Sequence, residues 1–236
     1  MRAPSYYSDP AFIDYRGAYV AAAIERLRKQ EAKPGQTYAS IENRLAQLIE
    51  DVKELRVVDD EKAETFTLEV CGSDGVFHAA RSLSDGTLRF LVLATLAIDS
   101  ENTGLICLEE PENGIHPGRI SAMVELLREI ACDPSYDVGP DNPLRQVIVN
   151  THSPAVMNSV DLNDLVYVDR TVRLSPSPEE PDYSRGLTTE VMVPPRSWRA
   201  GMSNGKPYLA AGHILPYFEA LRTGLPEQLE LDFPAE

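Results

Sequence analysis

The sequence predicts an α/β fold with a parallel sheet core, preceded by a helical hairpin and a β-hairpin. The short apolar run at residues 105–108 and the segment 146–150, apolar at its centre, are typical of parallel strands buried on both faces of a sheet. A helical pattern over residues 120–131 lies between them, and strand–helix–strand alternation is characteristic of parallel sheets. We expect a third strand of the same sheet at residues 165–169.

The segments before this sheet predict two helices and a β-hairpin. Apolar residues recur at helical spacing over residues 11–30 and again over residues 38–56. We expect the two helices to pack on the domain, with a dimer or partner surface as the alternative. Residues 65–71 alternate between apolar and polar side chains, and a glycine-bounded turn at 72–75 leads to a return strand at 76–79.

The chain divides by pattern into three parts. We expect a helical arm or insertion at residues 1–60, an α/β unit at 61–195 and a C-terminal tail at 196–236. Pro, Asp and Gly are frequent at 132–145 and 175–186, and both segments are expected to be surface loops. The remaining expected features are a strand at 187–193, a short helix near 213–222 and an acidic end at 227–236.

Composition excludes several classes of protein. The chain has 236 residues and a net charge of −15, and so acidic a surface repels the phosphates of nucleic acid. Apolar runs are too short to span a membrane, and no secretion signal opens the sequence. The cysteines Cys71, Cys107 and Cys132 have no metal-binding spacing, and Cys107 is expected to be a buried thiol. These features predict a cytoplasmic protein.

Two adjacent carboxylates follow the apolar run at residues 105–108. In open parallel sheets ligands bind at the carboxyl ends of strands, which is where Glu109 and Glu110 would lie. One acid at such a place can hold Mg²⁺ and the other can orient a water molecule. The alternative is that they are two solvated charges at the start of a turn.

Two further segments predict contacts with phosphate. Ser84 or Asp85 can cap the long apolar helix that follows, and Gly86 allows a ligand to approach the backbone closely. His152 comes just after the apolar run at 147–149, where an imidazole can contact a phosphate oxygen or a water. An ordinary capped helix and a histidine bonded to nearby backbone are the respective alternatives.

In this order the three segments resemble the ABC-type ATPases, especially the SMC, recombination-repair and OLD-like branch called AAA family ATPases. Ser84-Asp85-Gly86 resembles the signature motif, and residues 105–110 resemble the Walker B strand. Residues 112–117 resemble the loop that follows in this branch, and His152 resembles the switch histidine. The resemblance covers roughly residues 80–170 and implies a P-loop NTPase lobe that binds ATP and Mg²⁺.

The resemblance also implies a role for each matching residue. Glu109 would hold the magnesium ion, at a position where many relatives carry Asp. Glu110 would polarise the attacking water, and His152 would contact the γ-phosphate or that water.

The other matching residues would lie at a dimer seam. Ser84, Asp85 and the backbone of Gly86 would contact nucleotide held by a facing subunit. Asn113 and His116 would lie near the same seam. The resemblance therefore implies a homodimer, or a complex with a partner chain.

The family's phosphate-binding loop has no match in this sequence. The nearest segment, residues 201–207, has one residue too few between its glycines, carries Pro207 in place of a hydroxyl residue and follows the histidine motif instead of preceding the other motifs. The chain is then a piece of a longer ATPase, one half of a split ATPase whose partner carries Walker A, or a degenerate subunit. The intact Glu109, Glu110 and His152 disfavour the degenerate subunit.

Several functions follow from these alternatives. The first is the ATP-binding and hydrolysing lobe of an SMC-like ATPase, inactive until Walker A is supplied. The second is a non-catalytic regulatory or scaffold subunit that docks on a complete ATPase. A metal-dependent nuclease using Glu109, Glu110 and Glu112 is a third and less favoured hypothesis. DNA would be contacted only through the wider complex, and the biological process, whether DNA repair, chromosome structure or phage defence, stays open.

Overall fold

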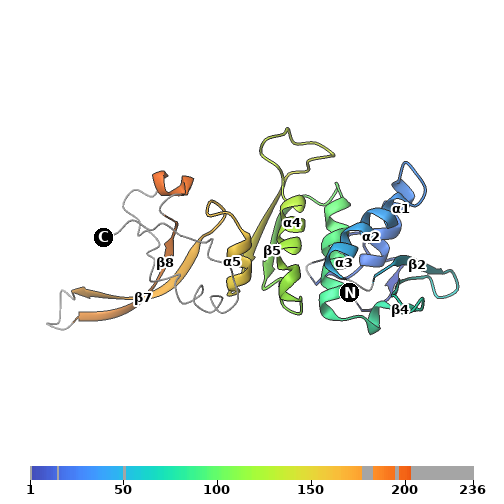
Figure 1. Cartoon of the computed structure of the whole chain (residues 1–236), viewed down its shortest axis with the longest axis horizontal. Coiled ribbons are helices and arrows are strands. Elements are labelled where there is room, and N and C mark those ends of the chain that lie inside the picture. The colour runs from blue at the N-terminus through green and yellow to red at the C-terminus, as the bar shows by residue number, and fades with distance from the viewer. Residues whose placement is uncertain (1, 15, 50–51, 177–182, 195–196, 203–236) are drawn as a thin grey trace. The chain divides into compact units, whose positions relative to one another are not determined.

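A computed structural model describes residues 2–14, 16–49, 52–176, 183–194 and 197–202 of the chain (Figure 1). The side chains of residues 171–186 and 201–202 are not among the features described. The chain forms two compact units, Met1–His152 and Ser153–Glu236. In the described ranges, no helix combines the length and apolar character that crossing a membrane requires.

The first unit combines helices with two separate sheets. Its helices are α1 (Val20–Gln30), α2 (Gln36–Leu48), α3 (Asp85–Ile98) and α4 (Ile120–Ile130), with short 3-10 turns η1 (Ala80–Ser82) and η2 (Pro117–Arg119). Its strands are β1 (Ser5–Tyr6), β2 (Glu54–Asp60), β3 (Thr65–Cys71), β4 (Phe77–Ala79), β5 (Gly104–Glu109) and β6 (Arg145–Asn150). The predicted class is confirmed: it is α/β, and a helical hairpin and a β-hairpin precede the parallel strands in the sequence.

The first helix begins later than its apolar pattern predicts. The Asp14 carboxylate accepts hydrogen bonds from the backbone N–H groups of Arg16, at 2.9 Å, and Ala18, at 2.7 Å. Such side-chain bonds compete with helix formation, and Tyr19 has the left-handed backbone angle φ of 63°. Helix α1 therefore starts only at Val20, and the prediction of a helix from residue 11 is wrong in its first half.

The second helix ends earlier than predicted, and its last expected turn is a strand. Ile49 is extended with φ of −136°. Strand β2 then pairs antiparallel with β3 over its whole length, where residues 54–56 were expected to be helical. Side chains of α2 hold this strand, because the backbone N–H of Leu55 donates to Glu42 at 2.7 Å and that of Val57 donates to the Tyr38 hydroxyl at 3.1 Å.

Strand β3 is the centre of an antiparallel sheet. Its order is β1–β3–β2, and β4 pairs with residues 69–71 of β3, beyond the two residues that β1 pairs. The predicted hairpin of residues 65–71 and 76–79 is confirmed, with Gly75 at φ of +72° in its turn. Apolar side chains of this sheet and of the helices form the core, and the most deeply buried include Ile24, Ile41, Leu45, Leu55, Leu68, Leu88, Leu91, Leu93 and Met123.

Strands β5 and β6 form a parallel pair with one open face. They pair in register from Gly104↔Arg145 to Glu109↔Asn150, which confirms both predicted strands. Burial on both faces was expected, yet Leu105 is 58% exposed and Ile148 is 56% exposed. Cys107 is exposed as well, so its prediction as a buried thiol is wrong. Among the described residues, β5 and β6 pair only with each other.

The second unit contains the short helix α5 (Pro154–Ser159), strands β7 (Tyr167–Pro176) and β8 (Tyr183–Met192), and the 3-10 turn η3 (Trp198–Met202). Strand β7 pairs antiparallel with β8, from Tyr167↔Met192 to Pro176↔Tyr183. The prediction that residues 165–169 extend the parallel sheet is therefore wrong, and the predicted loop at 175–186 lies partly in these two strands. The predicted helix near 213–222 and the acidic end at 227–236 lie outside the described residues.

Candidate functional site

The predicted glycine-bearing helix start is the N-terminus of α3. Ser84 is its N-cap, and its hydroxyl oxygen accepts from the backbone N–H of Thr87 at 3.1 Å. The same hydroxyl lies 2.8 Å from the Thr87 hydroxyl. Asp85 is the first helical residue, 84% exposed in its side chain, and its carboxylate lies 2.7 Å from the guanidinium of Arg2. Both side chains already have partners within the chain.

Gly86 makes the close approach that its lack of a side chain permits. A Cβ atom at this position would lie 2.8 Å from the carbonyl oxygen of Gly114, closer than side-chain carbons are found. Gly114 itself has φ of +85°, which favours glycine. The start of α3 therefore packs directly on the loop that follows β5, although the two segments are far apart in sequence.

Hydrogen bonds hold the backbone N–H, the backbone carbonyl and the carboxylate of Glu110. Its N–H donates to the carbonyl of Asn150 at 2.7 Å, and its own carbonyl accepts from the guanidinium of Arg89 on α3 at 2.7 Å. The side-chain amide of Asn113 donates to the Glu110 carboxylate at 2.7 Å. Glu110 also has φ of 42°, a left-handed conformation that costs about 1 kcal/mol or more for such a residue and is concentrated at functional sites.

Glu109 has a different environment from Glu110. It is the last residue of β5, where alternation places it on the same face as Leu105 and Cys107. It is exposed, and its carboxylate has no hydrogen-bond or ion-pair partner among the described residues. The acid predicted to hold magnesium therefore lies at the carboxyl end of the open face of the parallel pair.

The histidines differ in how they are held. His152 is exposed, two residues beyond Asn150 at the end of β6, and within the described ranges its imidazole has no hydrogen bond. His116 instead caps η2, and its ring nitrogen accepts from the backbone N–H of Gly118 at 3.2 Å. His152 is thus available to a ligand, whereas one nitrogen of His116 already has a backbone partner.

The carboxylates suit a metal ion that arrives with its own ligands. No group of three or more His, Cys, Asp or Glu side chains that could hold a metal occurs in the described part of the chain. Mg²⁺ commonly keeps several waters and takes one or two carboxylates together with substrate phosphates. Glu109 alone therefore fits the protein's share of such a site.

Comparison with known proteins identifies the family. Residues 9–158 match the family model described as "AAA domain, putative AbiEii toxin, Type IV TA system". The chain belongs to this family. It is an AAA-type ATPase domain, a class that generally uses nucleotide with Mg²⁺. A search of curated proteins found none that matches.

Solved structures of SMC proteins are similar to this AAA domain at low identity. One, from work on ATP-driven dimerization and DNA-stimulated activation of SMC ATPases, is 11% identical with a TM-score of 0.40, covering 81% of this chain and 97% of that one. The Pyrococcus yayanosii Smc head with a coiled coil is 11% identical with a TM-score of 0.38, covering 65% and 26%. An Smc head bound to the C-terminal winged-helix domain of ScpA is 9% identical with a TM-score of 0.41, covering 83% and 53%.

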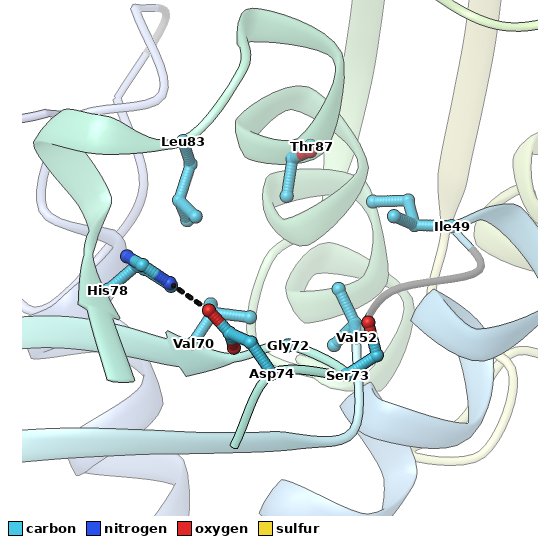
Figure 2. A pocket seen from close by; sticks show the side chains of 9 residues that line it. All are labelled: Ile49, Val52, Val70, Gly72, Ser73, Asp74, His78, Leu83 and Thr87. Carbon is cyan, nitrogen blue, oxygen red and sulfur yellow. Dashed lines mark hydrogen bonds and ion pairs between the residues drawn. The ribbon is translucent and has the colours of Figure 1, made fainter. Parts of the chain in front are cut away.

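A pocket of about 300 Å³ lies next to the start of α3 in this AAA domain (Figure 2). Figure 2 shows Leu83 and Thr87 on one side of it and the turn at Asp74 on the other. His78 lies 3.0 Å from Asp74, and the backbone N–H of Val76, followed by this imidazole, holds the pKa of the Asp74 carboxyl below its ordinary value. None of the predicted site residues lines this pocket.

Sequence reasoning missed three contributors to the site. Arg89 and Gly114 attach α3 to the Glu110 loop, and Thr151 donates a hydrogen bond to the Glu112 carboxylate. Arg89 lies three residues beyond Gly86, on the turn above it, and this spacing was a usable signal. The contacts of Gly114 and Thr151 carried no such signal, because their partners are distant in sequence.

Proposed function

We propose that this chain supplies part of a composite ATP-hydrolysing site and that a phosphate-binding loop completes it from another segment or a partner chain. The observation that carries the proposal is the joining of three motifs at one edge of β5 and β6. Gly86 packs on Gly114, Arg89 donates to the Glu110 carbonyl, and the Glu110 N–H donates to Asn150. These three contacts fix the positions of the loops, which a surface loop without a binding or catalytic role does not require.

The roles follow from the chemistry of each group. Glu110 accepts a proton from the attacking water, whose oxygen bonds to the γ-phosphorus as the bond to the bridging oxygen of ADP breaks. Asn113 orients the Glu110 carboxylate for this task. Glu109 would hold a magnesium ion, which would neutralise phosphate charge, and His152 donates to the γ-phosphate or the water.

The start of α3 serves the facing nucleotide. Backbone N–H groups at a helix N-terminus attract phosphate, and Ser84 and Gly86 present that terminus. Asp85 adds a carboxylate to the same first turn, where its pairing with Arg2 reduces repulsion of an anion. Two lobes closed around ATP, as homodimer or heterodimer, would bring this terminus against the partner's nucleotide.

The open face of the parallel pair is where the completing segment would pack. Parallel strands occur almost only in sheets covered on both faces, yet Leu105, Cys107 and Ile148 are exposed. Glu109 lies at the end of the same face, so a segment that covers it also brings bound phosphates to this acid. The carboxylate of Glu109 suits a loop that carries lysine.

The deciding experiment is ATP hydrolysis in Mg²⁺. The chain is assayed alone and together with the product of the neighbouring upstream reading frame, as wild type, Glu110→Gln and Glu125→Gln. Glu125 is an exposed acid on α4 and serves as the matched control. We expect turnover only in the mixture, a loss of about 10²- to 10⁴-fold in Glu110→Gln and no change in Glu125→Gln.

The alternatives give other results. A complex that forms without hydrolysis would support the regulatory or scaffold subunit. Turnover by the chain alone would show that the phosphate loop is present in it and that the composite-site proposal is wrong.

Thiol labelling tests the packing independently of catalysis. Cys107 is exposed, whereas Cys71 is buried, so a water-soluble alkylating reagent should modify Cys107 first. Binding of the completing segment should then protect Cys107. Unchanged labelling of Cys107 in a stable complex would place the interface elsewhere.

A further inference from the structure

One side-chain contact joins the two loops that carry Glu110 and His152. The last residues of the parallel pair are Glu109 and Asn150, and the Glu110 N–H to the Asn150 carbonyl is the last backbone bond between the loops in the described ranges. One residue past the end of β6, the hydroxyl of Thr151 donates to the carboxylate of Glu112. The contact continues the connection past the end of the ladder.

Glu112 and Thr151 are both restrained, so their contact can fix the position of one loop relative to the other. Glu112 belongs to a tight loop, in which the Asn113 N–H donates to the Glu110 carbonyl at 3.1 Å and the Ile115 N–H donates to the Glu112 carbonyl at 3.0 Å. Thr151 is β-branched, which limits its side-chain rotation. His152 is joined to Thr151 by one peptide bond, and so the place of its backbone follows that of the threonine.

Burial distinguishes Glu112 from a solvated surface acid. Its second carboxylate oxygen, Oε2, is buried and has no hydrogen-bond partner among the described residues. Leaving a buried polar atom without a partner has a free-energy cost. The contact with Thr151 is a hydrogen bond to a carboxylate, a stronger kind than a neutral pair, and it offsets part of this cost.

We infer that Glu112 and Thr151 are positioning residues that hold the His152 segment against the Glu110 loop. The inference rests on the proposed function, because the two loops carry the water-activating acid and the phosphate-contacting histidine of that proposal. Glu112 acts through Thr151 and its own loop, and it is not required to touch nucleotide or metal.

The test compares variants that differ only in this contact. Thr151→Val keeps the shape and removes the hydroxyl, Thr151→Ser keeps the hydroxyl, and Glu112→Gln keeps an acceptor oxygen while removing the charge. Thr103→Val, at an exposed threonine, is the matched control. Amide hydrogen exchange is measured on the full chain, and ATP turnover on the assembled ATPase.

Exchange reports the contact without any need for turnover. We expect Thr151→Val to speed exchange in both loops, residues 110–116 and 151–153, and Thr151→Ser and Thr103→Val to leave both unchanged. Exchange that is unaltered in Thr151→Val, or that rises only in residues 151–153, would overturn the inference. A failure of the proposed function alone would appear differently, as absent turnover in wild type with the exchange effect intact.

Kinetics separate positioning from general stability. In an active assembly, Thr151→Val should lower kcat by about 10- to 100-fold with little change in KM for ATP, because misplacement of a reacting group mainly affects the chemical step. Thr151→Ser should recover most of the rate, and Glu112→Gln should retain more activity than Thr151→Val. An equal rise of KM, or no recovery in Thr151→Ser, would contradict a positioning role.

Discussion

Replacing Gly86 by alanine tests the contact on which the candidate site depends. The new Cβ would lie 2.8 Å from the Gly114 carbonyl oxygen, and ordinary contact requires the two segments to separate by about half an ångström. The atom it meets is backbone, so no side-chain rotation relieves the overlap. Either α3 or the loop after β5 must move.

The expected cost comes from two opposing terms. Inserting a methyl group into a packed contact costs roughly 1–3 kcal/mol. Alanine in place of glycine in a helix returns up to about 1 kcal/mol. We therefore expect the free energy of unfolding to fall by about 1–2 kcal/mol, which lowers Tm by roughly 3–6 °C in a unit of this size.

Urea unfolding of Gly86→Ala and a matched glycine variant measures this effect. Gly139→Ala is the control, because a Cβ there meets nothing within 4 Å and the residue is not in a left-handed conformation. Its stability should lie within about 0.5 kcal/mol of wild type. If Gly86→Ala and Gly139→Ala unfold at the same urea concentration, α3 does not pack closely on the Glu110 loop in solution.

Three further substitutions test other parts of the first unit. Arg26→Ala should cost about 3–5 kcal/mol, because it leaves the fully buried carboxylate of Asp99, 2.6 Å from the guanidinium, without its partner. Leu91→Ala should cost about 2–5 kcal/mol by opening a cavity in α3. The hydrogen bond to Asp59 raises the pKa of Tyr7 to about 12, so the ultraviolet phenolate titration of wild type minus Tyr7→Phe should have its midpoint near that pH.

The controls follow from the same contacts. Arg2→Ala breaks an exposed ion pair and two exposed hydrogen bonds to backbone carbonyls. It should cost less than Arg26→Ala, because exposed interactions contribute little to stability, so equal losses in the two variants would contradict the role of burial. The native state holds the Tyr7 proton more tightly than the unfolded chain does. Its contribution to stability is therefore present below pH 10 and is lost as the pH rises toward 12. A Tyr7 midpoint near 10 would show that the Asp59 contact is absent in solution.

Local sequence patterns determined several secondary-structure elements of this protein. The alternation in residues 65–71, the cap at Ser84 and the apolar runs of β5 and β6 depend on near neighbours, and each was predicted. The order of these segments also resembles that of the ABC-type ATPases, and the family match confirms an AAA-type ATPase domain.

Only the tertiary structure decided the rest. Residues 54–56 form a strand despite their helical pattern, because β3 and the side chains of α2 make hydrogen bonds to the backbone of β2. Strand β7 pairs with β8 instead of joining the parallel pair. The exposure of Cys107 depends on which segments cover a sheet, and the contact of Gly86 with Gly114 joins residues distant in sequence. A sequence pattern shows which side chains share a face, but the contacts of that face depend on how the whole chain folds.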